Sequence, residues 1–400
     1  MRRGTATINN ATFTALLAGG MAAATFAGPA LAVLARFVID DLSLSRAELG
    51  WVVSAFSAFA AIASPGMGRL TDRVGGRNAL TGIFLMSGLG LIAIAAAPNY
   101  WLLIAAAMFT GVGQSLGNPS TNKLISLHIP AGSRGAVTGL KQSGVQIGVF
   151  LGGILLPAGA IAWGWRTTMT IAGGLALVSL SMVRTVVPKD PVHETLGRTG
   201  GSVAWTAPIL WLMVYGFLMG AAGGGVNTYI PLYGEESLGL SVTVAGAVAG
   251  AAGLVAFFSR VVWARHSESR TSYIRSLIQI AGLAMFFVAA LIAAPSWGIW
   301  LLWLGALGLG ASATSWNAVG MLAVMVYSGH GETGSASGVV LLGFLAGLSV
   351  GPPLFGWSVD RFDSYVPGLL GALVTFGVAM IVGLSWQRSV TQFSSVPAQT

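Results

Sequence analysis

The stretch that decides the fold is GMGRLTDRVGGR, residues 66–77, which lies between two long apolar segments. It contains four glycines, three arginines and one aspartate. An apolar helix needs about 20 residues to cross a bilayer, and both flanking segments reach that length. Because Lys and Arg are enriched in cytoplasmic loops, a short basic segment here is typical of a cytoplasmic turn between two transmembrane helices.

The composition extends this interpretation to the whole chain. Of the 400 residues, 54% are hydrophobic and 8% are charged, and the mean hydropathy is +0.78. Soluble domains carry about 25% charged residues, so a soluble protein this apolar could not cover its surface with polar groups. The alternating pattern of a membrane barrel is absent, which leaves an all-α membrane protein. With no cysteine, disulfides, thiolate chemistry and cysteine metal sites are excluded.

Twelve apolar segments are long enough to cross the membrane. They are residues 12–34, 47–68, 78–97, 101–126, 135–158, 166–186, 207–232, 242–263, 273–294, 298–325, 335–357 and 367–386. The longest connection, residues 187–206, is rich in Pro, Gly and charge. It predicts a cytoplasmic linker between two six-helix halves, residues 1–186 and 207–400, the second ending in a short cytoplasmic tail.

The basic residues indicate the orientation of the chain. With the N-terminus inside, fifteen of the 20 Lys and Arg residues fall on the cytoplasmic side and four outside, with Lys141 left inside a span. This positive-inside bias predicts a multi-pass protein of the cytoplasmic membrane with both termini in the cytoplasm. It also accounts for the net charge of +8 without nucleic-acid binding.

The two halves repeat each other at an offset of 199 residues. The matches include Gly111 with Gly310 and Asn118 with Asn317. Generic packing of small residues is the alternative, because the chain has 57 glycines. A run of matches at one offset favours two parallel repeats, an arrangement found in secondary transporters.

Several of these features resemble the major facilitator superfamily. Within residues 66–77, a glycine, three residues, an Asp-Arg pair and a Gly-Gly-Arg run resemble that family's signature between its second and third helices. The resemblance implies two pseudo-symmetric six-helix bundles that rock about a central site. It also implies a gate at the cytoplasmic ends of the helices, in which Asp72 locks the outward-facing state; a solvated turn is the alternative. The candidate gate residues are Gly68, Asp72, Arg73, Arg77 and, in a degraded second copy of the loop, Glu268.

A glycine pattern in the fifth span recurs in the eleventh and resembles the glycine-rich fifth helix of the family. Glycines let helices approach closely, and a proline can kink a helix. The pattern therefore predicts helix packing, either static or at an interface that flexes. Its members are Gly139, Gly148, Gly152, Gly338, Gly347, Gly351 and Pro352.

Lys141 lies six residues into the predicted span 135–158, whereas the other basic residues fall in loops or within three residues of a span end. An ionisable residue within the membrane is a functional candidate by default. With no buried carboxylate to pair with it, an anionic substrate group is the obvious counter-ion. The alternative is a lysine that snorkels to the cytoplasmic interface.

Polar side chains gather in spans near Lys141 and in the second half. Burying an unpartnered amide is costly, so these residues predict a substrate site, with amides that bridge helices as the alternative. The candidates are Gln142, Gln146, Gln114, Asn118, Asn122, Asn227, Tyr229, Trp316 and Asn317. Acids and histidines fall in predicted loops or at helix ends, so any proton dependence must come from the substrate, from Lys141 or from a helix-end acid such as Asp40.

These observations predict a transporter, not an enzyme, that moves a small solute such as an organic anion across the cytoplasmic membrane. We expect a monomer in the lipid bilayer, with no cofactor, no metal and no nucleic-acid partner. An efflux carrier for amphipathic compounds is the alternative within this class. A membrane sensor that binds a ligand without moving it is the alternative from another class.

Overall fold

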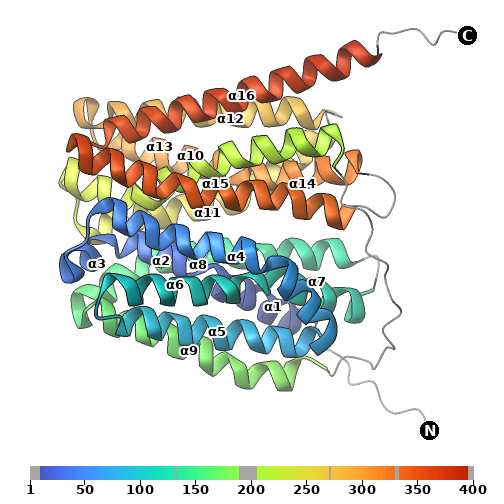
Figure 1. The fold of residues 1–400 in the computed structure, drawn as a ribbon, viewed down its shortest axis with the longest axis horizontal. Coiled ribbons are helices and arrows are strands. Elements are labelled where there is room, and N and C mark those ends of the chain that lie inside the picture. The colour runs from blue at the N-terminus through green and yellow to red at the C-terminus, as the bar shows by residue number, and fades with distance from the viewer. Residues whose placement is uncertain (1–9, 131–132, 189–204, 270–271, 329–332, 395–400) are drawn as a thin grey trace, which may run out of the picture.

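The computed structural model describes residues 10–130, 133–188, 205–269, 272–328 and 333–394, and these residues are all helix or connection. The helices form two groups that lie side by side (Figure 1). The N-terminal half contains α1 (Asn10–Thr25), α2 (Ala27–Val33), α3 (Ala35–Leu42), α4 (Arg46–Val74), α5 (Gly76–Ala96), α6 (Tyr100–Ser115), α7 (Gly117–His128), α8 (Arg134–Trp163) and α9 (Trp165–Val186). The C-terminal half contains α10 (Ala207–Leu238), α11 (Val242–Ser269), α12 (Tyr273–Trp297), α13 (Trp300–Ala311), the 3-10 turn η2 (Ala313–Ser315), α14 (Trp316–Tyr327), α15 (Thr333–Phe362) and α16 (Val366–Ser394).

The number of membrane spans agrees with the sequence. Within the described residues, eleven helices are long and apolar enough to cross a membrane, and one bent pair, Ala11–Thr25 with Ala27–Val33, would make the twelfth. That pair bends by 56°. Each predicted span corresponds to one of these helices or pairs, so the all-α fold with about twelve spans is confirmed.

Two spans are broken at equivalent places in the two halves. The fourth span divides into α6 and α7 around Leu116, and the tenth divides into α13 and α14 around η2. These breaks stand at the repeat offset of 199 residues, directly before Asn118 and Asn317. The repeat seen in the sequence therefore recurs as a repeat of backbone shape.

The basic segment that opened the sequence analysis is mostly helical, which differs from the expected loop. Helix α4 continues to Val74, so Gly68, Asp72 and Arg73 lie in its last two turns. The chain turns at Gly75, where φ is +87°, a conformation that costs a residue with a Cβ more than it costs glycine. Helix α11 likewise continues to Ser269. In both cases the helix extends past the point at which the apolar segment ends.

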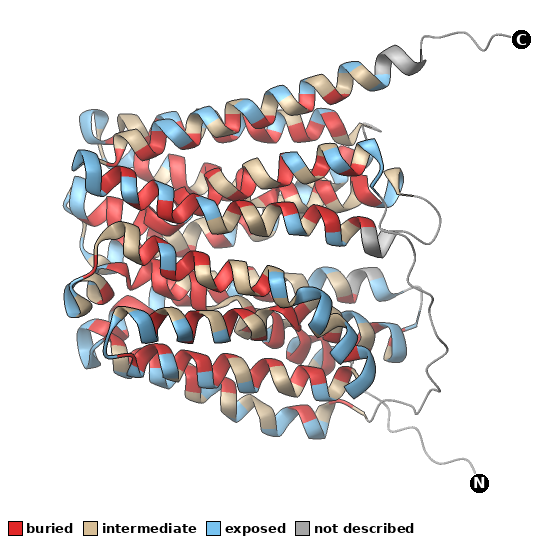
Figure 2. Ribbon diagram, in the orientation of Figure 1, coloured by how far each residue is buried: buried red, intermediate tan, exposed pale blue. Residues whose placement is uncertain are grey.

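The burial pattern is that of a bundle surrounded by lipid. Buried residues line the inner faces of the helices, and the exposed faces point outward (Figure 2). Many of those exposed side chains are large and apolar, such as Leu175 and Val178 on α9, at 65% and 68% exposure. A soluble protein rarely exposes apolar surface on this scale.

Two helix pairs make the main contacts between the halves, α4 with α15 and α8 with α11. A Cβ on Gly50 would lie 2.6 Å from the Pro352 carbonyl oxygen, and one on Gly153 would lie 2.5 Å from the Gly246 carbonyl oxygen. We call the end where α1 begins and α16 ends the terminal end, and the opposite end the distal end (Figure 1). Both close approaches lie toward the distal end.

The predicted packing glycines have two different environments. Gly148 and Gly152 face Ala22 and Phe26, and Gly347 and Gly351 face Phe217 and Ala221. These four glycines therefore bring α8 against the first span and α15 against α10, inside each half. Nothing lies within 4 Å of a Cβ built on Gly139 or on Gly338.

Candidate functional site

The central feature of the site is Lys141, whose side chain is 0% exposed. Its Nζ atom donates to Thr121 Oγ1 at 2.7 Å, to Asn122 Oδ1 at 2.7 Å and to Asn118 Oδ1 at 3.2 Å. An ammonium has three donors, and all three are used by neutral oxygens of α7. The lysine is thus turned onto α7 and does not reach the surface.

We call Lys141, Gln142, Asn118, Thr121 and Asn122 the Lys141 cluster, and none of these residues is an acid. Gln142 Nε2 donates to Asn118 Oδ1 at 2.9 Å, so this one oxygen accepts from both Lys141 and Gln142. Among the ion pairs of the described residues, none includes Lys141. Buried charges are normally paired, and an ammonium here has no counter-ion in the part of the chain that the structure describes.

Two glutamines extend the cluster toward the distal end. The Oε1 atoms of Gln114 and Gln146 are buried, and neither has a hydrogen-bond partner among the described residues. The backbone of Gln146 lies at the seam between the halves, because its carbonyl oxygen would be 3.5 Å from a Cβ on Gly253. Unpartnered buried polar atoms call for an explanation, and a bound polar molecule would supply one.

Arg260 is a candidate that sequence reasoning did not select, because it lies near the end of the predicted span 242–263 and was counted with the cytoplasmic basic residues. The structure places it within α11, nine residues before the end of that helix. Its Nη2 atom donates to the Thr314 carbonyl oxygen at 3.3 Å, and its Nε atom is buried without a partner among the described residues. No ion pair within the described ranges includes it. The signal in the sequence that could have identified Arg260 is its spacing of seven residues from Gly253, which lies at the contact between the halves.

Helical spacing puts the backbone of Arg260 on the face of α11 that contacts the N-terminal half. Gly246 and Gly253 on that face contact α8, and Arg260 follows Gly253 by seven residues, which is nearly two full turns. It stands about 10 Å along the helix axis from Gly253, while Lys141 stands about 7.5 Å along α8 from Gln146. Because α8 and α11 are antiparallel, the two cations lie at similar depth, one in each half.

Three other predicted substrate residues, Asn227, Trp316 and Asn317, lie in the C-terminal half. Asn227 is exposed and Asn317 is half-buried, so both keep polar surface available. Trp316 is 1% exposed and packs in the C-terminal half against Tyr215 and Phe344. The structure does not bring Trp316 to the Lys141 cluster.

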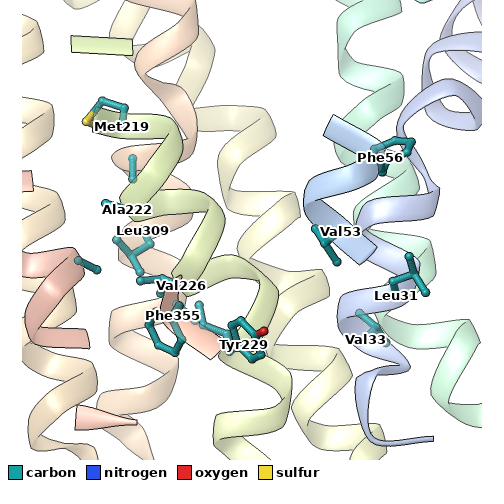
Figure 3. Packing of buried hydrophobic residues seen from close by; sticks show 14 of the residues in the cluster. Leu31, Val33, Val53, Phe56, Met219, Ala222, Val226, Tyr229, Leu309 and Phe355 are labelled. Carbon is teal, nitrogen blue, oxygen red and sulfur yellow. The ribbon is translucent and has the colours of Figure 1, made fainter. Parts of the chain in front are cut away.

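Tyr229 lies in the distal contact between the halves. Its ring stacks on Phe355 with centroids 5.1 Å apart, and its hydroxyl donates to the Arg46 carbonyl oxygen. Figure 3 shows Tyr229 beside Phe355, with Val53 of α4 on the other side of the view. This residue joins the halves instead of lining the Lys141 cluster.

Arg46 is the centre of an ionic lock between the halves at the distal end. Its Nη2 atom lies 2.7 Å from Glu236 Oε2, and its Nη1 atom lies 3.6 Å from Asp360 Oδ1. The Asp360 carboxylate also accepts from the backbone N–H groups of Arg46 and Ala47 at 3.1 and 2.7 Å. Tyr365 donates to Glu236 at 2.7 Å. Every ion pair between the halves in the described residues lies at this end.

The candidate gate residues lie at the terminal end, within their own halves. Lys123 Nζ donates to the Thr71 and Asp72 carbonyl oxygens at 3.0 Å each and lies 3.6 Å from the Asp72 carboxylate. Arg77 donates to the Arg184 carbonyl oxygen. Glu268 is exposed on α11 and Gly68 is half-buried on α4, and nothing lies within 4 Å of a Cβ on Gly68.

Comparisons with known sequences identify a family and relatives that are transporters. The family model described as Major Facilitator Superfamily matches residues 14–352. The chain is 24% identical to the hexuronate transporter of Bacillus subtilis, covering 93% of this chain and 92% of that one. It is 26% identical to the gentisate transporter of Corynebacterium glutamicum, with coverage of 88% and 83%. It is 29% identical to a probable nitrate/nitrite transporter of Mycobacterium tuberculosis, with coverage of 85% and 87%.

Solved structures share the fold at low sequence identity. A bacterial homolog of the human lysosomal transporter Spinster, in an inward-facing and unoccupied conformation, has a TM-score of 0.81 and 16% identity. The match covers 99% of this chain and all of that one. A variant of the nucleoside transporter NupG has a TM-score of 0.78 and 14% identity, with coverage of 93% and 99%.

Proposed function

Since the chain belongs to the Major Facilitator Superfamily, we propose that it carries a small organic anion across the cell membrane by alternating access. The observation that carries the proposal is the pair of cations described above. Lys141 in one half and Arg260 in the other each lack a carboxylate partner in the described residues. An anion bound between them would supply the missing negative charge to both halves.

The chemistry of the cluster suits a carboxylate with hydroxyl or carbonyl groups. A guanidinium offers a planar fork of donors to a carboxylate, and an ammonium offers a point charge. Gln114, Gln146 and Asn122 would supply amides to the polar part of such a molecule. The names of the relatives support this class, because hexuronate, gentisate and nitrate are all anions.

The rival substrate class is a lipophilic cation or another amphipathic compound, exported from the cell. Such a cation would meet two like charges, Lys141 in one half and Arg260 in the other. At 4 Å, two unit charges repel by about 4 kcal/mol at an effective dielectric constant of 20. The observed charges therefore favour the anion.

We further propose that the terminal end is cytoplasmic and that the structure faces inward. The excess of Lys and Arg at that end supports the orientation. The ionic lock around Arg46 closes the distal end, and Asn122, which contacts Lys141, is exposed on α7. In this state the substrate would reach the cluster from the cytoplasm.

Asp72 would act in the opposite state, when the terminal ends of the helices meet. Its side chain is 80% exposed, and among the described residues its carboxylate has one ion pair, the 3.6 Å contact with Lys123, so it is available for a partner in the other half. The C-terminal end of α11, with its basic residues Arg265 and His266, would approach it. Opposite charges at helix ends can stabilise such a closed arrangement.

A counterflow experiment tests the proposal. Purified protein is reconstituted into liposomes loaded with glucuronate, gentisate or nitrate, and entry of the labelled anion is measured. We expect saturable counterflow of at least one carboxylate and none of tetraphenylphosphonium. Counterflow of the cation alone would contradict an anion carrier, and saturable binding without counterflow would indicate a sensor.

A further inference from the structure

A second unusual charge lies at the distal end, away from the Lys141 cluster. Glu235 stands in the last turn of α10, and its side chain is 1% exposed. Its nearest cation is Arg36 of α3 in the opposite half, whose Nη1 atom lies 3.7 Å from Glu235 Oε2. That distance is too long for a hydrogen bond, and Oε2 has no hydrogen-bond partner in the described part of the chain.

The charges around Glu235 compensate it poorly. The guanidinium of Arg36 is 55% exposed and is shared with Asp40, which lies 3.7 Å from Arg36 Nε. The next residue on α10, Glu236, is a second acid, and its carboxylate is paired with Arg46. Glu235 thus faces one shared cation and two neighbouring acids.

The other two acids of the distal contact differ from Glu235. Asp360 accepts two backbone N–H groups at the start of α4, at 3.1 and 2.7 Å. Glu236 accepts from the Arg46 guanidinium at 2.7 and 3.0 Å and from the Tyr365 hydroxyl at 2.7 Å. Hydrogen bonds to the ionised form stabilise it, so Asp360 and Glu236 are built to remain charged. Glu235 is not.

We propose that Glu235 is a proton-binding site and that closure of the distal end takes up one proton there. Glu235 belongs to the C-terminal half and Arg36 to the N-terminal half, so opening the distal end separates them and exposes the carboxylate to water. Closure buries the same group to 1% exposure. Burying the neutral acid costs much less than burying an ionised carboxylate with a weak partner.

The direction of the effect follows from linkage. A proton that binds the closed state more tightly than the open state must favour closure, and closure must favour protonation. Acid on the distal side would therefore shift the protein toward the state seen here. With the distal end outside the cell, an acidic exterior would favour the step that turns the loaded site inward.

The test measures the distance between the outer ends of the two halves. The chain has no cysteine, so spin labels can be placed at will. Ala96→Cys on α5 and Ser296→Cys on α12 are both exposed at the distal end. Double electron–electron resonance on this pair, without substrate, should show the short-distance population growing as the pH falls from about 8 to about 5, a range open to a buried carboxylate.

Two variants separate Glu235 from its neighbours. In Glu235→Gln, which carries a neutral amide of nearly the same shape, we expect the short distance to dominate at every pH. In Asp40→Asn, which removes the 70% exposed acid that shares Arg36, the pH response should remain. A pH response that persists in Glu235→Gln, or none in the parent protein, would overturn the proposal. Neither outcome depends on which solute the protein carries.

Discussion

The Nζ atom of Lys141 lies 2.7 Å from Oδ1 of Asn122, and Asn122 is exposed although Lys141 is not. The amide therefore stands between a buried ammonium and the solvent at the terminal side. An anion that displaces the Asn122 oxygen would contact the ammonium directly, while Thr121 and Asn118 would continue to hold it. The buried charge can thus act at the site without moving far.

Breaking the distal lock should open the distal end. Arg46→Gln removes the ion pairs with Glu236 and Asp360, whose side chains are 31% and 25% exposed. Because solvent screens such pairs, we expect a loss of about 1 kcal/mol, which corresponds to a roughly fivefold gain of the open state. The Ala96→Cys and Ser296→Cys distance pair would report it as a larger long-distance population. An unchanged distribution would show that apolar packing alone closes this end.

The glycines at the seam should be more sensitive than those of the repeated motif. A Cβ on Gly50 would lie 2.6 Å from a backbone oxygen of the other half, and a Cβ on Gly139 would touch nothing within 4 Å. Backbone atoms cannot yield as a flexible side chain can, so Gly50→Ala should prevent full closure and abolish most transport. Gly139→Ala is the matched control and should transport normally in the same liposome assay. Equal activity of the two variants would refute the importance of the close approach.

Asp72→Asn should separate transport from folding. The carboxylate is 80% exposed, and Lys123 holds the end of α4 through backbone oxygens that the variant retains. We therefore expect an unchanged melting temperature and a sharp fall in flux, because the outward-facing state would lose the gate proposed above. Wild-type flux in Asp72→Asn would leave this residue as part of an ordinary helix end.

Apolar segment length predicted the spans because the hydrophobic thickness of a bilayer is nearly fixed. It could not predict where the helices end. Helix α4 continues past the predicted end at residue 68 to Val74, and α11 continues past residue 263 to Ser269, because helices extend beyond the apolar layer. The sequence analysis counted Arg260 with the basic residues of the cytoplasmic side and did not select it as a site residue.

The site was predicted only in part for a related reason. Lys141 stood out because it interrupts an apolar run, and Asn118 and Asn122 share a helix face. Thr121, which accepts from Lys141 at 2.7 Å, gave no comparable signal. Tyr229 and Lys141 are both buried polar residues in spans, yet Tyr229 joins the halves and Lys141 of α8 donates to side chains of α7 in its own half. Sequence spacing does not reveal which neighbour a helix face meets.

The most direct test of the central claim is a binding titration with the anion that gives counterflow, on the parent protein and three variants. A charge-assisted hydrogen bond contributes roughly 1.5–3 kcal/mol, so Lys141→Ala and Arg260→Ala should each weaken binding by about 10- to 150-fold. Arg69→Ala, which removes an exposed arginine from α4, controls for net charge and should leave the affinity within about twofold, since exposed charges interact weakly. Normal anion affinity in both Lys141→Ala and Arg260→Ala would contradict a site built on these two cations.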